Sequence, residues 1–167
     1  MAVMFSVTLL LSAKDASADK QARSFLAAGP LVTVSGHLDQ RVLGGLGGEL
    51  TFMRYPWTAY WGGLGAFAQV ESAGLDHVRA ATGAQASFLI FGGELGFFIE
   101  GASKVRATTV GIQASPFVSI GFVSIGFRMG FPLAAVSSGP KYATNLGLSL
   151  ALKWPFPLDG SYIAYRG

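Results

Sequence analysis

The sequence predicts an all-β fold, in which about eight antiparallel strands form an up-and-down barrel that spans a membrane. Three observations lead to this prediction. Charged residues make up 13% of the 167-residue chain and hydrophobic residues 51%, whereas soluble domains carry about 25% charged residues. Hydrophobic residues alternate with small or polar ones along most of the chain, which is the period of a strand. The connections between these runs alternate between short and long, as expected for an up-and-down barrel with two different rims.

Composition excludes several kinds of site and partner. The chain has no cysteine, so it carries neither a disulfide framework nor a thiolate metal site. Its formal net charge is +3, but the basic residues are spread singly, and nucleic-acid binding needs them clustered. Apolar runs are interrupted before they reach the roughly 18 residues of a spanning helix. We therefore expect strands to cross the membrane, and no nucleic acid as a partner.

The N-terminus has features of a targeting segment. A short apolar stretch ends at Leu11 and is followed by Ala16-Ser17-Ala18, the small-x-small pattern of a signal-peptidase site. We predict a cleaved signal peptide over residues 1–18, although the usual positive charge at the start is missing. A disordered or helical N-terminus is the alternative. The barrel domain is expected over 19–158, followed by a short C-terminal tail over 159–167.

Eight runs with period two are predicted as strands. They cover residues 25–36, 41–55, 58–72, 77–89, 91–101, 106–118, 120–131 and 142–155. These lengths suit tilted membrane strands of roughly 9 to 11 residues with some overhang. They are long for a small soluble sandwich.

Each run has one oily face and one face of small or polar residues. In the third run, Leu64 and Val70 share a face, and Gln69 and Glu71 lie on the opposite one with two glycines. In the seventh run, Arg128 lies among serine and glycine, opposite valine, isoleucine and phenylalanine. The last run is the clearest. There Leu146, Leu148, Leu150, Leu152 and Trp154 alternate with Asn145, Gly147, Ser149, Ala151 and Lys153.

The connections predict two different rims. Short turns are expected at 55–57, 90–92 and 119–121, and longer loops at 36–40, 72–76, 102–105 and 132–141. With an even number of strands, both ends of the barrel lie on the short-turn rim, which faces the periplasm in outer-membrane barrels. Proline cannot donate a hydrogen bond to a ladder. We therefore expect a bulge at Pro30 and a position near a rim for Pro116.

The residues opposite the leucines indicate which face points inward. They are mostly glycine, serine, alanine, threonine and glutamine, which suit a crowded interior, since an eight-stranded barrel is only wide enough to be filled by side chains. Phe67, Phe98 and Phe122 are expected among the few large inward groups. The motif GGEL occurs at 47–50 and again at 92–95. Its glutamates share the phase of the glycines and are expected to point inward.

Charge balance predicts a plug of two acids and two bases inside the barrel. Glu49 and Glu94 would meet Arg128 and Lys153, which have the same inward phase in later strands. A lone charge in that interior would be costly. On the lipid face instead, Arg128 or Lys153 would cost roughly 2–4 kcal/mol at mid-depth.

Aromatic residues gather near the predicted short-turn rim. Rings with a polar edge favour the membrane interface, where they form girdles, and ordinary core packing is the alternative. The residues expected in the girdle are Tyr55, Trp57, Tyr60, Trp61, Trp154 and Phe156.

At this level of pattern the chain resembles the small outer-membrane β-barrels of the OmpA/OmpX type, over roughly residues 25–155. Residues 145–152, NLGLSLAL, are similar to the β-signal that the barrel-assembly machinery reads, through Asn145, Gly147, Leu150 and Leu152. Such proteins usually end on an aromatic residue, whereas here LDGSYIAYRG follows Phe156. The resemblance implies a location in the bacterial outer membrane, with lipid and the assembly machinery as partners.

The sequence contains no convincing catalytic or cofactor motif. The two histidines, His37 and His77, fall near predicted loops and are expected to be solvated, so neither a metal nor a cofactor is predicted. We expect an integral outer-membrane protein with a structural or interaction role and no enzymatic activity. One alternative is a soluble calycin-like barrel whose Leu/Val/Phe face lines a cavity for an apolar ligand. Another is a lipid-modifying enzyme that uses His77 with Ser72.

Overall fold

The computed structural model describes residues 23–39, 42–55 and 62–158 and contains nine strands. No helix among these residues is long and apolar enough to cross a membrane. The strands are β1 (Arg23–His37), β2 (Val42–Tyr55), β3 (Gly62–Ala73), β4 (His77–Phe88), β5 (Phe91–Glu100), β6 (Thr109–Ile120), β7 (Val123–Ala135), β8 (Asn145–Leu152) and β9 (Trp154–Pro157).

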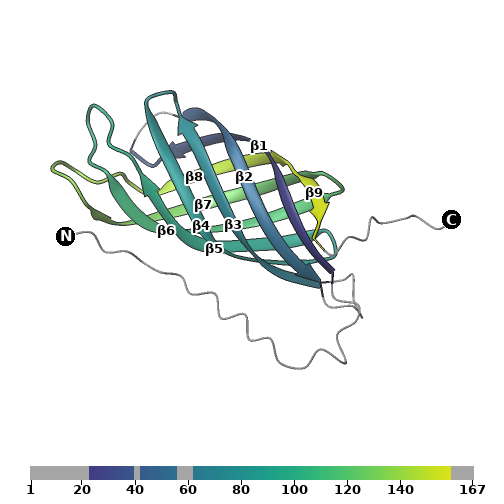
Figure 1. Cartoon of the computed structure of the whole chain (residues 1–167). Coiled ribbons are helices and arrows are strands. Elements are labelled where there is room, and N and C mark those ends of the chain that lie inside the picture. Colours follow the sequence, from purple (N-terminus) through teal and green to yellow (C-terminus); the bar gives the residue numbers. More distant parts are fainter. Residues whose placement is uncertain (1–22, 40–41, 56–61, 159–167) are drawn as a thin grey trace.

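The strands close into a single barrel, which confirms the predicted all-β, antiparallel up-and-down fold. Each strand from β1 to β7 pairs antiparallel with the next along the chain, and β1 pairs with β2 on one side and with β8 and β9 on the other. The last two strands have the same register against β1, so they act as one strand interrupted at Lys153. The barrel therefore has eight strand positions and no open edge (Figure 1).

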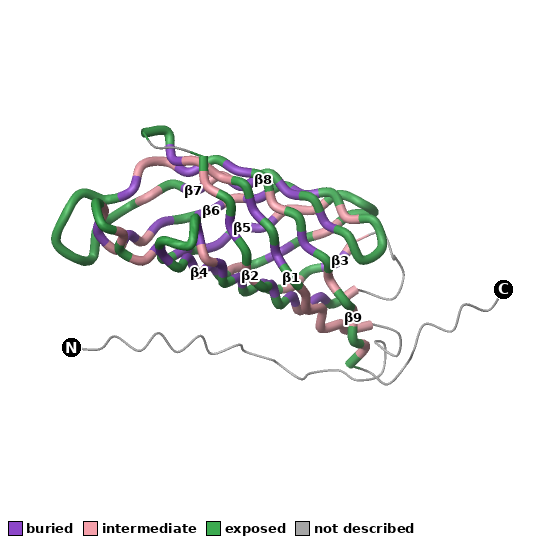
Figure 2. Tube along the Cα trace, turned by 90° about the horizontal axis from the view of Figure 1, so that it is seen from above, coloured by how far each residue is buried: buried purple, intermediate pink, exposed green. Residues whose placement is uncertain are grey.

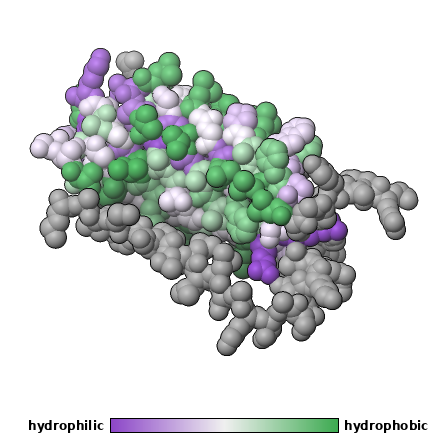
Figure 3. All heavy atoms as spheres, in the orientation of Figure 1, coloured by the Kyte–Doolittle hydropathy of each residue, from purple (hydrophilic) through white to green (hydrophobic). Residues whose placement is uncertain are grey.

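Burial alternates along every long strand, as the period of two requires. In β5, for example, Glu94 and Phe98 are buried, whereas Leu95 and Phe97, which lie between them in the sequence, are exposed. The alternation runs around the whole wall (Figure 2), and the visible flank of the molecule is largely hydrophobic (Figure 3). The large hydrophobic side chains thus lie mainly outside, and the apolar core inside is the small cluster of Phe67, Ala81 and Phe98.

Glycines allow the walls to come close where large side chains enter the lumen. Gly83 and Gly96 face each other across β4 and β5, and a Cβ added to Gly83 would lie 2.2 Å from the carbonyl oxygen of Leu95. Gly93 has the outward phase of β5, and a Cβ added there meets nothing within 4 Å. The two positions therefore differ sharply in the space that a methyl group would find.

This difference gives a prediction for a matched pair of variants. Gly83→Ala should lower the free energy of unfolding by about 1–3 kcal/mol, because backbone must move to admit the methyl group. Gly93→Ala should change it by less than about 0.5 kcal/mol. Urea titrations of the two folded barrels measure both values. Equal effects at the two positions would contradict this account of the wall.

Several strand ends differ from the prediction by two to four residues. The strand β7 extends to Ala135 rather than residue 131, and β6 begins at Thr109 rather than residue 106. The connection between β3 and β4 is only three residues, not a long loop. Gly74 and Leu75 reverse the chain there with φ of 60° and 58°, a left-handed pair that suits tight hairpins. The turn predicted at 55–57 includes residues outside the described part of the chain.

The prolines are accommodated differently from the prediction. Pairing of β1 with β2 runs through Pro30 without a shift in register, so the bulge expected there is absent. Pro30 has no N–H to donate, and on its other side β1 pairs with β8 and β9, between which the strand is interrupted at Lys153. The shift in register lies instead between β6 and β7, where Val110 faces Ala134 and Gly111 faces Pro132. Pro116 lies inside β6 rather than near a rim.

Short and long connections lie on opposite rims of the barrel, as predicted. Leu89–Ile90 and Gly121–Phe122 are the two-residue turns of one rim, which we call the short-turn rim, and β1 begins and β9 ends on it (Figure 1). The longer connections, between β5 and β6 and between β7 and β8, lie on the opposite loop rim. The predicted signal peptide (1–18) and tail (159–167) lie outside the described residues.

Candidate functional site: the charged lumen

The inward faces of the strands bring half of the charged side chains of the described residues into the barrel. This happens because these residues share the phase of the buried positions of their strands. We call the central group the lumen network, and it consists of Glu49, Gln69, Glu71, Arg79, Glu94, Gln113, Arg128 and Lys153. Lys153 lies at the break between β8 and β9, and Gln69 and Glu71 come from β3.

Gln69 is the centre of the lumen network. Its amide nitrogen donates hydrogen bonds to Glu49 at 3.3 Å and to Glu94 at 3.1 Å. Its amide oxygen accepts hydrogen bonds from Gln113 at 3.2 Å and Arg128 at 3.5 Å. One neutral amide therefore links two carboxylates to a guanidinium. This arrangement satisfies buried polar groups that would otherwise destabilise the interior.

Two arginines share the carboxylate of Glu71. Arg128 forms an ion pair with Glu71, and the Nε of Arg79 lies 4.0 Å from the same oxygen. The second oxygen of Glu71 accepts a hydrogen bond of 2.8 Å from Thr33. Arg79 also donates to Gln113 at 3.0 Å and Asn145 at 3.3 Å, and its guanidinium lies 4.2 Å from the ring centre of Phe98.

A second polar group closes the lumen at the loop rim. We call it the rim cluster, and it consists of His37, His77, Glu100 and Tyr142. His77 Nε2 lies 2.8 Å from Glu100 Oε1, and His37 Nε2 lies 3.3 Å from Glu100 Oε2. The ring of Tyr142 lies 4.8 Å from that of His37 and 5.0 Å from that of His77. The prediction that the histidines are solvated is therefore wrong, because both take the inward phase at strand ends.

Tyr142 comes from the loop between β7 and β8 and is almost fully buried. Its hydroxyl donates a hydrogen bond of 2.9 Å to the carbonyl of Gly101, in the loop between β5 and β6. Burial raises the pKa of this hydroxyl, which keeps it a hydrogen-bond donor. The same two loops are also joined by backbone hydrogen bonds, from Ala107 to Pro140 and from Val136 to Thr108.

Tyr142→Phe tests how far this hydroxyl holds the two loops together. Losing one hydrogen bond costs about 0.5–1.5 kcal/mol, so exchange of the Ala107 and Val136 amides should become faster by up to about tenfold. Hydrogen exchange measured by NMR gives the rates. The amide of Ser119, which bonds Ile90 on the opposite rim, should be unchanged and is the internal control. Unchanged exchange at all three amides would contradict the role given to Tyr142.

The four charged residues predicted to meet are all inside the lumen, but they do not form one plug. Lys153 contacts Glu49 in an ion pair. Glu94 lies near them and accepts its hydrogen bond from Gln69. Arg128 pairs with Glu71 instead of with either predicted glutamate. The sequence had placed Glu71 on the inward face without assigning it a partner.

The predicted lumen residues did not include Arg79, Gln113 and Glu100, although the alternation of residue types in their strands indicates an inward direction for each. Each has the inward phase of its strand, in β4, β6 and β5 respectively. Phe122 was predicted to point inward and is instead exposed, stacked 4.9 Å from Trp154. It lies in the turn between β6 and β7, where the alternation of the strand no longer applies.

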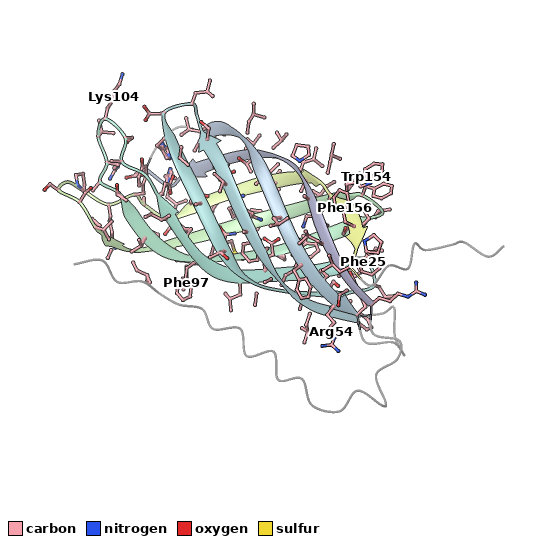
Figure 4. The ribbon with its side chains drawn as sticks, viewed as in Figure 1. Phe25, Arg54, Phe97, Lys104, Trp154 and Phe156 are labelled. Carbon is pink, nitrogen blue, oxygen red and sulfur yellow. The ribbon has the colours of Figure 1, made fainter. Side chains whose placement is uncertain are left out.

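Three of the six predicted girdle residues lie in the described part of the chain. Trp154 and Phe156 are exposed on the outer wall at the short-turn rim, close to Phe25 (Figure 4). Tyr55 is half-buried, and its ring meets that of Phe25 edge-on at 5.9 Å. Trp57, Tyr60 and Trp61 lie outside the described residues.

The residues of the predicted assembly signal lie along β8. Asn145 and Gly147 point inward, and Asn145 receives the hydrogen bond from Arg79. Leu150 and Leu152 are exposed on the outer wall. Closure of the barrel pairs this strand with β1.

The geometry of the described residues bears on two kinds of catalytic site, a metal centre and a serine–histidine pair. No group of three or more His, Cys, Asp or Glu side chains among the described residues is arranged to hold a metal ion. Ser72 is cross-strand partner to Val78, whereas His77 is partner to Ala73. Since successive residues point to opposite faces, Ser72 and His77 lie on opposite sides of the wall. This removes the serine and histidine pair that a lipid-modifying enzyme was expected to use.

Together these features define a class of protein: a closed, eight-stranded up-and-down barrel with an apolar outer wall and a hydrogen-bonded, charged interior. Comparison with known proteins gave no match, either to a protein-family profile, to a curated protein or to a solved structure. The function is therefore inferred from the residues of the chain itself.

Proposed function

We propose that the protein is an integral barrel of the bacterial outer membrane, with a structural or interaction role and no catalysis. The observation that carries this proposal is the inverted distribution of polarity. Large hydrophobic side chains cover the outside of the wall, and four buried carboxylates and two buried guanidiniums lie inside. In water such a wall would expose an apolar surface far larger than monomeric soluble proteins tolerate. In a bilayer it would contact acyl chains.

The soluble calycin-like alternative requires the opposite arrangement. Its Leu/Val/Phe face would line an internal cavity, whereas here Leu64, Leu95 and Leu148 are among the most exposed side chains of the wall. The lumen instead contains the network of ion pairs and amides described above. Because these side chains contact one another across the lumen, we do not expect continuous conduction.

The loop rim is the proposed place of interaction. Each of its four connections exposes one large aliphatic side chain: Leu38, Leu75, Val105 and Val136. These side chains are available to contact a partner at this rim. The loops there are tied together by Arg106, which contacts Asp39 and donates to the carbonyl of Lys141 at 3.0 Å. Lipid around the wall and the assembly machinery during insertion are the other proposed partners.

The migration of the protein on SDS gels, with and without boiling, tests the proposed class. A closed membrane barrel resists SDS until it is heated, so the unboiled sample should run faster than the boiled one. The protein should also stay with membranes after carbonate washing. Recovery in the aqueous phase without detergent would refute the proposal. Conversion of phospholipid or lipid A by purified protein would refute the absence of catalysis.

A further inference from the structure

A cavity of about 380 Å³ opens at the short-turn rim, below the lumen network. It is formed by the beginning of β1, the end of β2 and the turns between β4 and β5 and between β6 and β7. Its volume is within the range of about 300–1,000 Å³ typical of small-molecule sites. Most of its wall is aromatic or aliphatic, through Phe25, Met53, Tyr55, Leu89, Ile90 and Phe117.

One polar group in this cavity has no hydrogen-bond partner among the described residues. Gln85 points inward from β4, lines the cavity and is only 6% exposed. Its side-chain oxygen is buried and accepts no hydrogen bond from the residues that the structure describes. Buried carbonyl oxygens are nearly always paired, and an unpaired one calls for an explanation. A hydrogen-bond donor bound in the cavity would satisfy it.

The charges around Gln85 favour a cationic donor. Glu94 is the cross-strand neighbour of Gln85, and Lys153, the cation that lines the cavity, is already paired with Glu49. Glu94 itself accepts a hydrogen bond from the neutral amide of Gln69. An anionic group beside Gln85 would be repelled by the carboxylate of Glu94. An ammonium group would be attracted by that carboxylate and by the aromatic rings of the cavity wall.

We infer that this cavity is a binding site for a small amphipathic amine. The ammonium group donates to the side-chain oxygen of Gln85, and the apolar body packs against Phe25, Met53, Tyr55 and Phe117. The inference uses only the lumen side of the short-turn rim. It therefore holds or fails independently of the proposed membrane location.

The chain offers a direct probe of this cavity, because the two described methionines lie on opposite sides of the wall. Met53 is buried and lines the cavity, whereas Met129 is a half-buried residue of β7 away from it. The folded full-length protein, labelled with ¹³C at the methionine methyl groups, is titrated with 2-phenylethylamine. 2-Phenylethanol serves as the neutral comparison and 3-phenylpropionate as the anionic one.

We expect the Met53 methyl resonance to shift with saturation and that of Met129 to remain in place. The amine should bind more tightly than the alcohol, and at least tenfold more tightly than the carboxylate. Gln85→Leu should weaken amine binding at least tenfold. Ser124→Ala, which changes a buried lumen serine that does not line the cavity, should leave it within twofold.

Ser87→Phe keeps the test decisive if Gln85→Leu does not fold. Ser87 lines the cavity, so the larger ring should fill it and abolish saturable binding. Three results would overturn the inference: parallel shifts of both methyl groups, which indicate partition into detergent; equal binding of amine and carboxylate; or unchanged amine binding when Gln85 is replaced or the cavity is filled.

Discussion

Glu71→Ala should lower the free energy of unfolding by about 3–5 kcal/mol, the cost of leaving a buried charge without its partner. Glu71 forms the ion pair with Arg128 and lies 4.0 Å from the Nε of Arg79. Without this carboxylate, two guanidiniums face each other inside the barrel, and the hydrogen bond from Thr33 is also lost. Urea unfolding of the barrel in lipid vesicles measures the change.

Glu94→Gln is the matched control for this prediction. Glu94 is also a buried lumen glutamate, but it accepts a hydrogen bond of 3.1 Å from the neutral amide of Gln69. A glutamine can take its place without leaving a cation unpaired, so the loss should be about 1 kcal/mol or less. A double variant, Glu71→Ala with Arg128→Met, should recover part of the loss. Equal effects of Glu71→Ala and Glu94→Gln would contradict the central place given to Glu71.

Leu95→Arg should destabilise the barrel in lipid by about 2–4 kcal/mol, the cost of a cation on the lipid face near the bilayer midplane. Leu95 lies at the middle of β5, and 65% of its surface is exposed on the outer wall. Val105→Arg is the control, because Val105 is equally exposed, at 69%, but lies in a loop of the loop rim. Its effect should be within about 0.5 kcal/mol. In a water-soluble barrel, both substitutions would be neutral.

The alternation of residue types was sufficient to predict the fold and the inward direction of the charges. It placed Glu49, Glu94, Arg128 and Lys153 in the lumen, because phase is a local property of one strand. It did not identify the partner of each charge. The pairs across the lumen depend on how far each strand is staggered against the others, and stagger is set by closure of the whole barrel.

The rim cluster was missed for a related reason. His37 and His77 are the last and first residues of their strands, so an error of one or two residues in a strand end moves them from the lumen to a solvated loop. Tyr142 is outside the strands altogether, and only the fold of its loop brings it back over the histidines. Pro30 shows the same limit, because the pairing of β1 with β2 continues through it without the predicted bulge.

The absence of cysteine from the chain allows single spin labels to test the central claim, that lipid surrounds the outer wall. Labels at Leu95→Cys, Leu148→Cys and Val105→Cys in reconstituted protein would be compared by power saturation, with oxygen as the apolar relaxant and nickel chelate as the aqueous one. We expect oxygen to dominate at positions 95 and 148 and the chelate to dominate at position 105. Strong contact of the chelate with labels at 95 and 148 would contradict the account.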